Sequence, residues 1–214
     1  PSIFARVRHD LPEFRRYVLL LFESMGMLLM PMSAGIGLVA ADAVTVVLGE
    51  KWRNATVLIQ ALALFAVVKS VSPLSAQILI SRGRADAARR QSLMGLAVLP
   101  LAFLFASRYG AVAVALVWTT LYPFLVAFQI HEASRDIELS LMTIARRLWP
   151  ITFATLLMSG AVYGVRLWLA GDAIAPALRL AVCVAVGAAA YAGAIAVLAM
   201  DRLRAALAFV RARG

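Results

Sequence analysis

Six long apolar stretches recur along this chain of 214 residues, separated by short polar segments. At ~1.5 Å of rise per residue, a helix of about 20 apolar residues crosses a bilayer's hydrocarbon core, which is roughly 30 Å thick. Hydrophobic residues make up 63% of the chain and charged residues only 15%, a balance outside the range of soluble domains. A soluble protein with an unusually apolar core is excluded, because runs with at most one charge recur along the whole sequence.

The predicted fold class is therefore all-α: a polytopic membrane protein with six transmembrane helices. The polar segment 131–147 carries Ile137, Leu141 and Ile144 at helical spacing, which favours an amphipathic linker helix on the membrane surface. Prolines inside the spans should bend their helices. We expect the spans at about 17–41, 55–80, 92–107, 110–130, 148–170 and 174–200.

The net charge of +10 is distributed as a membrane protein requires. In a soluble protein it would suggest nucleic acid, but here the basic residues sit in short clusters between apolar runs. Basic residues mark cytoplasmic segments, so both ends of the chain are predicted to be cytoplasmic, with membrane lipids as neighbours and no nucleic acid. The lead-in 1–16, the loop 81–91, the linker 131–147 and the tail 201–214 hold 15 of the 21 basic residues.

Residue types that carry catalysis or bind metals are scarce. Cys183 is the single cysteine, so no intrachain disulfide is possible. His9 and His131 are far apart and lack the spacing of a metal site. There is no phosphate-binding glycine loop, nucleophile elbow or cluster of carboxylates within a span. We expect no cofactor, no metal and no enzymatic activity.

Lys69 is the deepest charge in the predicted spans, about 11 residues or ~16 Å from the inner end of its span. A lysine at this depth is unfavourable unless it faces water or a partner. We interpret Lys69 as a cation of a central cavity that attracts an anionic group of a substrate. The alternative is that it pairs with an acid or with carbonyls of a neighbouring span and holds the bundle together.

Three further charges lie inside predicted spans. Glu23, ~9 Å from Tyr17, is within reach of Lys69 and could couple transport to an ion gradient. Its alternative role is a hydrated carboxylate near the interface, bonded to Ser24 or to arginines at the inner edge. Arg166 and Arg179 lie near outer helix ends, where snorkelling to headgroups is the simpler interpretation and substrate binding by Arg179 the other.

Three local features together resemble a known family. They are the turn Gly49–Asn54 with Trp52, the helical stretch Ile59-Gln60-Ala61-Leu62-Ala63, and the loop Gly83-Arg84. This pattern, from about Phe4 to the end, resembles the C-terminal half of bacterial polysaccharide flippases, which belong to the multidrug/oligosaccharidyl-lipid/polysaccharide exporter superfamily.

The resemblance implies one six-helix lobe of a two-lobed transporter in the bacterial inner membrane. The missing N-terminal lobe would precede Pro1. The implied substrate is an oligosaccharide on undecaprenyl diphosphate, used for surface polysaccharides such as O-antigen and exopolysaccharide. Two alternatives stay open: a multidrug or cation exporter of the same superfamily, which a central Lys69 argues against, and a non-transporting membrane subunit of a polysaccharide-assembly complex.

Overall fold

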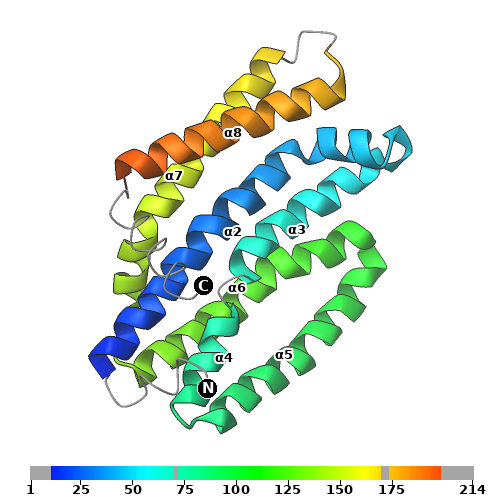
Figure 1. The fold of residues 1–214 in the computed structure, drawn as a ribbon. Coiled ribbons are helices and arrows are strands. Elements are labelled where there is room, and N and C mark those ends of the chain that lie inside the picture. The colour runs from blue at the N-terminus through cyan, green and yellow to red at the C-terminus, as the bar shows by residue number, and fades with distance from the viewer. Residues whose placement is uncertain (1–10, 70–71, 170–173, 199–214) are drawn as a thin grey trace. The chain divides into compact units, whose positions relative to one another are not determined.

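The computed structural model describes residues 11–69, 72–169 and 174–198, and within these ranges it is built of helices and turns without a strand (Figure 1). Six helical segments of the described part are long and apolar enough to cross a membrane, which confirms the predicted all-α class. The elements are α2 (Leu11–Val47), η1 (Glu50–Ala55), α3 (Thr56–Lys69), α4 (Ser72–Ser81), α5 (Ala85–Ala106), η2 (Ser107–Tyr109), α6 (Ala111–Asp136), α7 (Leu141–Trp168) and α8 (Pro176–Leu198).

Several helices are longer than the predicted spans. α2 begins at Leu11 and ends at Val47, so it takes in part of the lead-in and extends six residues beyond the predicted span 17–41. α5 begins at Ala85, so only residues 82–84 of the predicted loop 81–91 connect α4 to α5. Apolar runs mark only the part of a helix that contacts hydrocarbon, whereas arginine and glutamate are also good helix formers. The expected tail 201–214 and the first ten residues of the lead-in lie outside the described residues.

The predicted amphipathic linker helix 131–147 does not form as a separate element. α6 runs to Asp136 and α7 starts at Leu141, so the polar stretch consists of two helix ends and a short turn. In that turn Glu138 has a positive φ of 49°, and the N–H of Leu139 donates to Ser134 O at 2.8 Å. Of the apolar residues that we assigned to a membrane-facing stripe, Ile137 and Ile144 are buried in the protein interior, whereas Leu141 is exposed.

The second predicted span contains two described helices. α3 ends at Lys69 and α4 begins at Ser72, with residues 70 and 71 outside the described part. Proline lacks an N–H group, so Pro73 cannot donate to the carbonyl of Lys69 four residues earlier.

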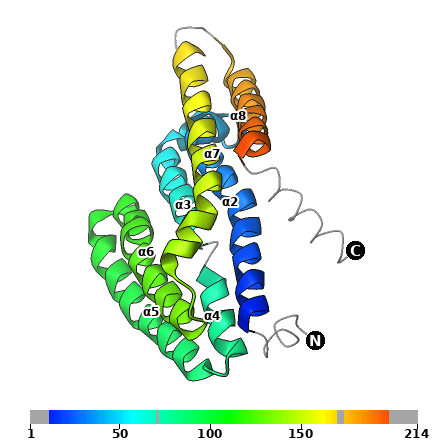
Figure 2. The same ribbon diagram turned by 90° about the vertical axis from the view of Figure 1, so that its left-hand side faces the viewer.

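The chain divides into two compact units. Unit 1 comprises residues 1–26 and 65–147, and unit 2 comprises residues 27–64 and 148–214. In unit 1, α4, α5 and α6 pack side by side (Figures 1 and 2). Gly83, with φ of 80°, ends α4 in a Schellman turn: its N–H donates to Ile80 O at 3.0 Å, and that of Arg84 donates to Leu79 O at 2.8 Å. This turn fixes the position of Arg84.

In unit 2, α7 and α8 pack against each other and against the second part of α2. Val39, Val162 and Cys183 from these three helices form a buried core cluster. Gly187 allows close packing of α8 on α7, because a Cβ there would lie 3.0 Å from a methyl group of Val162. α7 and α8 therefore approach each other closely at Gly187.

Pro31 within α2 frees a backbone carbonyl, and α8 satisfies it. Because Pro31 has no N–H, the carbonyl of Met27 loses its helical donor. Tyr191 of α8 donates its hydroxyl to this oxygen at 2.7 Å. A backbone carbonyl without a partner is unfavourable in an apolar environment, so the tyrosine compensates for the proline.

We expect Tyr191→Phe to lower the free energy of unfolding by about 1–3 kcal/mol, because Met27 O then has no donor. In a Pro31→Ala background the new N–H of residue 31 can bond Met27 O, so the same substitution should cost less than about 1 kcal/mol. A double-mutant cycle measured by denaturant unfolding in detergent checks this. Equal losses of unfolding free energy in both backgrounds would contradict the idea that Tyr191 compensates for Pro31.

Candidate functional site

Lys69 stands at the C-terminal end of α3, beside a cluster of aromatic rings in unit 1. Its Nζ donates to the hydroxyl of Tyr122 at 3.0 Å and lies 5.3 Å from the centroid of the same ring. Phe65 precedes Lys69 by one turn on α3, and Trp118 precedes Tyr122 by one turn on α6. The ring centroids of Phe65 lie 4.6 Å from Trp118 and 5.0 Å from Tyr122. Lys69 is therefore held by a phenol and a π face.

Sequence reasoning missed this aromatic cluster. The sequence feature that could have indicated it is a spacing of four residues, which places each of two pairs on one face of its helix. The pairs are Phe65 with Lys69 and Trp118 with Tyr122. Nothing in one sequence shows that the two faces meet. Tyr122 is buried, whereas the side chain of Lys69 is exposed, so the ammonium group lies at the edge of the cluster and not beneath it.

The charge of Lys69 has no acidic partner among the described residues, where its contacts are those with Tyr122. An ammonium group has three N–H donors, so the phenol leaves further donors for another acceptor. Along the chain, Lys69 precedes Ser81, the last residue of α4, by 12 residues. The described contacts of Lys69 therefore do not neutralise its positive charge.

Glu23 lies on α2 and is buried, at 5% exposed. Its Oε1 accepts a hydrogen bond from Arg147 of α7, at 3.5 Å. Lys69 has no described contact with Glu23, so the pair that the sequence allowed is not formed here. The observed partner is an arginine, which is the alternative that the sequence left open.

The helix ends of unit 1 carry a network of charged side chains. Arg84, positioned by the Gly83 turn, donates to Asp136 and contacts Glu132 at 3.4 Å. The hydrogen bond with Asp136 raises the pKa of the Arg84 guanidinium above its ordinary value. Gln91 donates to Glu132 at 2.8 Å, and Arg15 of α2 bonds the Ile137 carbonyl and Glu138. The network joins α2, the α4–α5 turn and the end of α6.

A second charged cluster lies in unit 2, centred on Asp42 of α2, which is 1% exposed. Arg179 of α8 donates to Oδ1 through Nε at 2.8 Å and also through Nη2. Arg166 of α7 places Nη2 3.8 Å from Oδ2 and donates through Nη1 to the carbonyl of Leu38. Two guanidinium groups thus share one carboxylate, which leaves a net charge of one positive unit.

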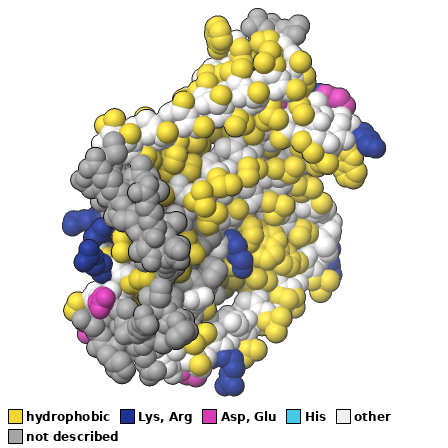
Figure 3. Space-filling view, viewed as in Figure 1, with side chains coloured by type: hydrophobic (Ala, Val, Ile, Leu, Met, Phe, Trp, Pro, Cys, Tyr) yellow, Lys and Arg dark blue, Asp and Glu magenta, His cyan; other side chains and the backbone are white. Residues whose placement is uncertain are grey.

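The structure therefore places Arg179, our candidate substrate contact, on a buried carboxylate. Sequence reasoning assigned no role to Asp42, which lies just beyond the predicted span 17–41. The described residues contain no group of three or more histidine, cysteine or acidic side chains that could hold a metal ion. Figure 3 shows one face of the protein, where hydrophobic side chains dominate the described surface and basic side chains form separate spots.

Comparison with known proteins shows a family match for the N-terminal part of the chain. Residues 1–57 of the 214 match the model of a family described as polysaccharide biosynthesis protein. The matched part covers α2 and η1 and includes Glu23 and Asp42, but it ends before Lys69. No curated protein and no solved structure matches the chain. The N-terminal part is thus similar to polysaccharide biosynthesis proteins.

If Lys69 faces a water-filled passage, a cysteine at this position should react with a membrane-impermeant maleimide. The background is Cys183→Ala, which removes the native thiol. We expect Lys69→Cys in intact membranes to react roughly tenfold faster or more than Leu64→Cys, because thiolate forms only where water reaches it. Leu64 is a matched control, since it is exposed on the same helix. Equally slow labelling at both positions would place Lys69 against lipid.

Proposed function

We propose that this protein is a non-enzymatic membrane transporter, or one lobe of one, that moves a lipid-linked oligosaccharide across the bacterial inner membrane for surface polysaccharide synthesis. Two findings support the membrane and polysaccharide parts of this proposal: six helical segments able to span a bilayer, and the match of residues 1–57 to polysaccharide biosynthesis proteins. The transport role and the undecaprenyl diphosphate carrier rest on the resemblance and on the chemistry of Lys69.

The observation that carries the proposal is the exposed Lys69 ammonium without an acidic partner in the described residues. Most described arginines near the helix ends contact a carboxylate, as Arg84 and Arg179 do. Of the 21 basic residues only Lys51 and Lys69 are lysines. A lysine is a flexible point charge, whereas arginine favours fixed, forked pairing. Lys69 therefore suits an anionic ligand that moves, such as the diphosphate of a lipid carrier.

The aromatic rings beside Lys69 add apolar surface to the charge. Phe65 and Trp118 are partly exposed, and their ring centroids lie 4.6 Å apart. Binding sites commonly combine aromatic walls with a few polar groups that orient the ligand. A ligand with both apolar faces and an anionic group, such as a sugar bearing phosphate, fits this combination.

The two alternative functions require other features. A drug or cation exporter needs acidic groups for its substrate, whereas Lys69 would repel a cation. A non-transporting subunit needs no exposed cation within a span.

We propose that Glu23 and Arg147 form a fixed pair within unit 1, while ion coupling by Glu23 stays a prediction. The cytoplasmic placement of the termini is likewise proposed from the distribution of basic residues.

We expect Lys69→Met to reduce surface polysaccharide roughly tenfold or more, because loss of a charge-assisted contact to phosphate removes that much binding. Lys69→Arg, which keeps the charge, should retain part of the export. The assay is complementation of cells that lack the gene, with surface polysaccharide and protein abundance measured together. Lys51→Met is the matched control, since Lys51 lies in the exposed η1 segment.

Normal export by Lys69→Met at normal abundance would remove Lys69 from the mechanism. A loss of polysaccharide with both Lys69→Met and Lys51→Met would indicate a general effect on the protein. Accumulation of lipid-linked oligosaccharide on the inner face in the Lys69→Met strain would support a block in transport itself, and its absence would favour an assembly role.

A further inference from the structure

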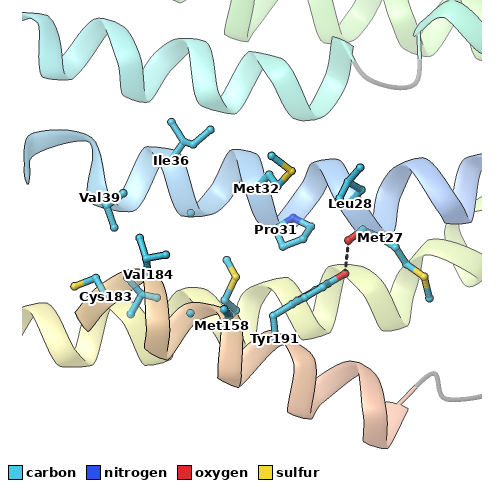
Figure 4. A pocket seen from close by; sticks show the side chains of 14 residues that line it. Met27, Leu28, Pro31, Met32, Ile36, Val39, Met158, Cys183, Val184 and Tyr191 are labelled. Atoms are coloured by element: carbon cyan, nitrogen blue, oxygen red, sulfur yellow. Dashed lines mark hydrogen bonds between the residues drawn. The ribbon is translucent and has the colours of Figure 1, made fainter. Parts of the chain in front are cut away.

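Unit 2 contains an open apolar groove of about 410 Å³ between α2, α7 and α8. Figure 4 shows that α2 forms one wall, with Met27 at one end and Val39 at the other, and that α8 contributes Tyr191 and Cys183 opposite. The Tyr191 hydroxyl is already bonded to Met27 O. The groove therefore offers almost no free polar group along its length, and an apolar chain is the ligand that it suits.

Charged residues stand one turn beyond the same end of this groove on all three helices. On α2, Asp42 follows Val39 by three residues. On α7, Arg166 follows Val162 by four, and on the antiparallel α8, Arg179 precedes Cys183 by four. Residues three or four apart share a helix face, so each charge lies in line with an apolar wall of the groove. The contacts with Asp42 confirm that the charges meet.

This charged end carries a net positive charge and unused donors. The Asp42 carboxylate neutralises one of the two guanidinium groups. Each guanidinium has five N–H donors, and the described contacts of Arg166 and Arg179 use only part of them. Their side chains are 27% and 30% exposed, so an acceptor from outside can reach them. Arginine pairs are well suited to phosphate because of their forked geometry.

From this arrangement we propose that unit 2 binds one anionic glycerophospholipid of the bilayer. One acyl chain lies in the groove, and the phosphate contacts Arg166 and Arg179 beside Asp42. The site lies in unit 2 and does not depend on Lys69, so it goes beyond the proposed transport function.

The length of the groove favours a bilayer lipid as the occupant. From Met27 to Val39 the α2 wall extends 12 residues, or ~18 Å. One leaflet of the hydrocarbon core is roughly half of 30 Å thick. An acyl chain anchored by its headgroup at the charged end would thus occupy most of the groove. A much longer polyprenyl chain would extend beyond the Tyr191 end.

The test uses the full-length protein in nanodiscs of phosphatidylglycerol and phosphatidylcholine with identical chains, followed by native mass spectrometry of the retained lipid. We expect the wild-type protein to retain phosphatidylglycerol selectively. Arg179→Gln should reduce this selectivity roughly tenfold, because it removes a charge-assisted contact with phosphate. Asp42→Asn should instead raise it, since it leaves both guanidinium groups uncompensated. Opposite effects at two residues of one ion pair separate a ligand site from a purely structural pair.

A third variant tests the groove itself. Gly35 lines the groove, and a Cβ there would meet no atom within 4 Å, so Gly35→Leu should fill the space without disturbing the packing. We expect it to abolish lipid retention. Gly193→Leu is the matched control, because it also has open space around the Cβ but does not line the groove. Its retention should equal that of the wild type.

Three outcomes would overturn the proposal. One is equal retention of both lipids by the wild type, and another is a change in the same direction for Arg179→Gln and Asp42→Asn in folded protein. The third is selective retention of a polyprenyl phosphate, added as a competitor, in place of phosphatidylglycerol. In the last case the groove would hold the chain of a different amphiphile. Folding of each variant is checked by its elution profile in detergent.

Discussion

The need to satisfy polar groups in apolar surroundings governs this structure. Helices that cross a bilayer meet no water in the hydrocarbon core, so charges and freed backbone groups require partners within the protein. The Met27 carbonyl, freed by Pro31, accepts from Tyr191, and the buried Asp42 accepts from Arg179 at Oδ1 and has Arg166 3.8 Å from Oδ2. Arg84 likewise contacts the acidic end of α6. Each of these contacts joins helices that are distant in sequence, so the same interactions that satisfy the polar groups also specify which helices pack together.

Lys69 differs from this pattern because its described contacts are with the hydroxyl and ring of Tyr122, which leave its charge uncompensated. A hydrogen bond from an ammonium to a neutral phenol orients the side chain but does not neutralise it. Such a contact is also easily exchanged, since a phosphate oxygen is a stronger acceptor for a cation than a phenol. The contact with Tyr122 thus gives the ammonium a defined resting position, and in the proposed function an anion of the substrate replaces this contact.

The fold class could be predicted from the sequence because hydrophobicity, helix length and bilayer thickness are linked by simple geometry. Helix ends could not, since α2 and α5 continue through polar residues whose helix propensity is high and whose apolar signal is absent. The error at 131–147 has a related cause. Apolar residues at helical spacing indicate a buried stripe, but they do not show whether lipid or protein covers it, and Ile137 is covered by protein.

Of the candidate sites, the sequence predicted only the charged residues and not their partners. Lys69, Glu23 and Arg179 stood out because each is a charge within an apolar run, yet their partners Tyr122, Arg147 and Asp42 lie 53, 124 and 137 residues away. A single sequence carries no signal for contacts at such separations. Residue type nevertheless carries some of this information. Here the fixed pairs with carboxylates are formed by arginines, whose planar guanidinium group has the geometry for such pairing. In a chain with 21 basic residues of which only two are lysines, a lysine within a span is the position where a mobile charge is retained. Under the proposed function, the choice between the two cations separates charges that hold helices together from one that contacts a ligand.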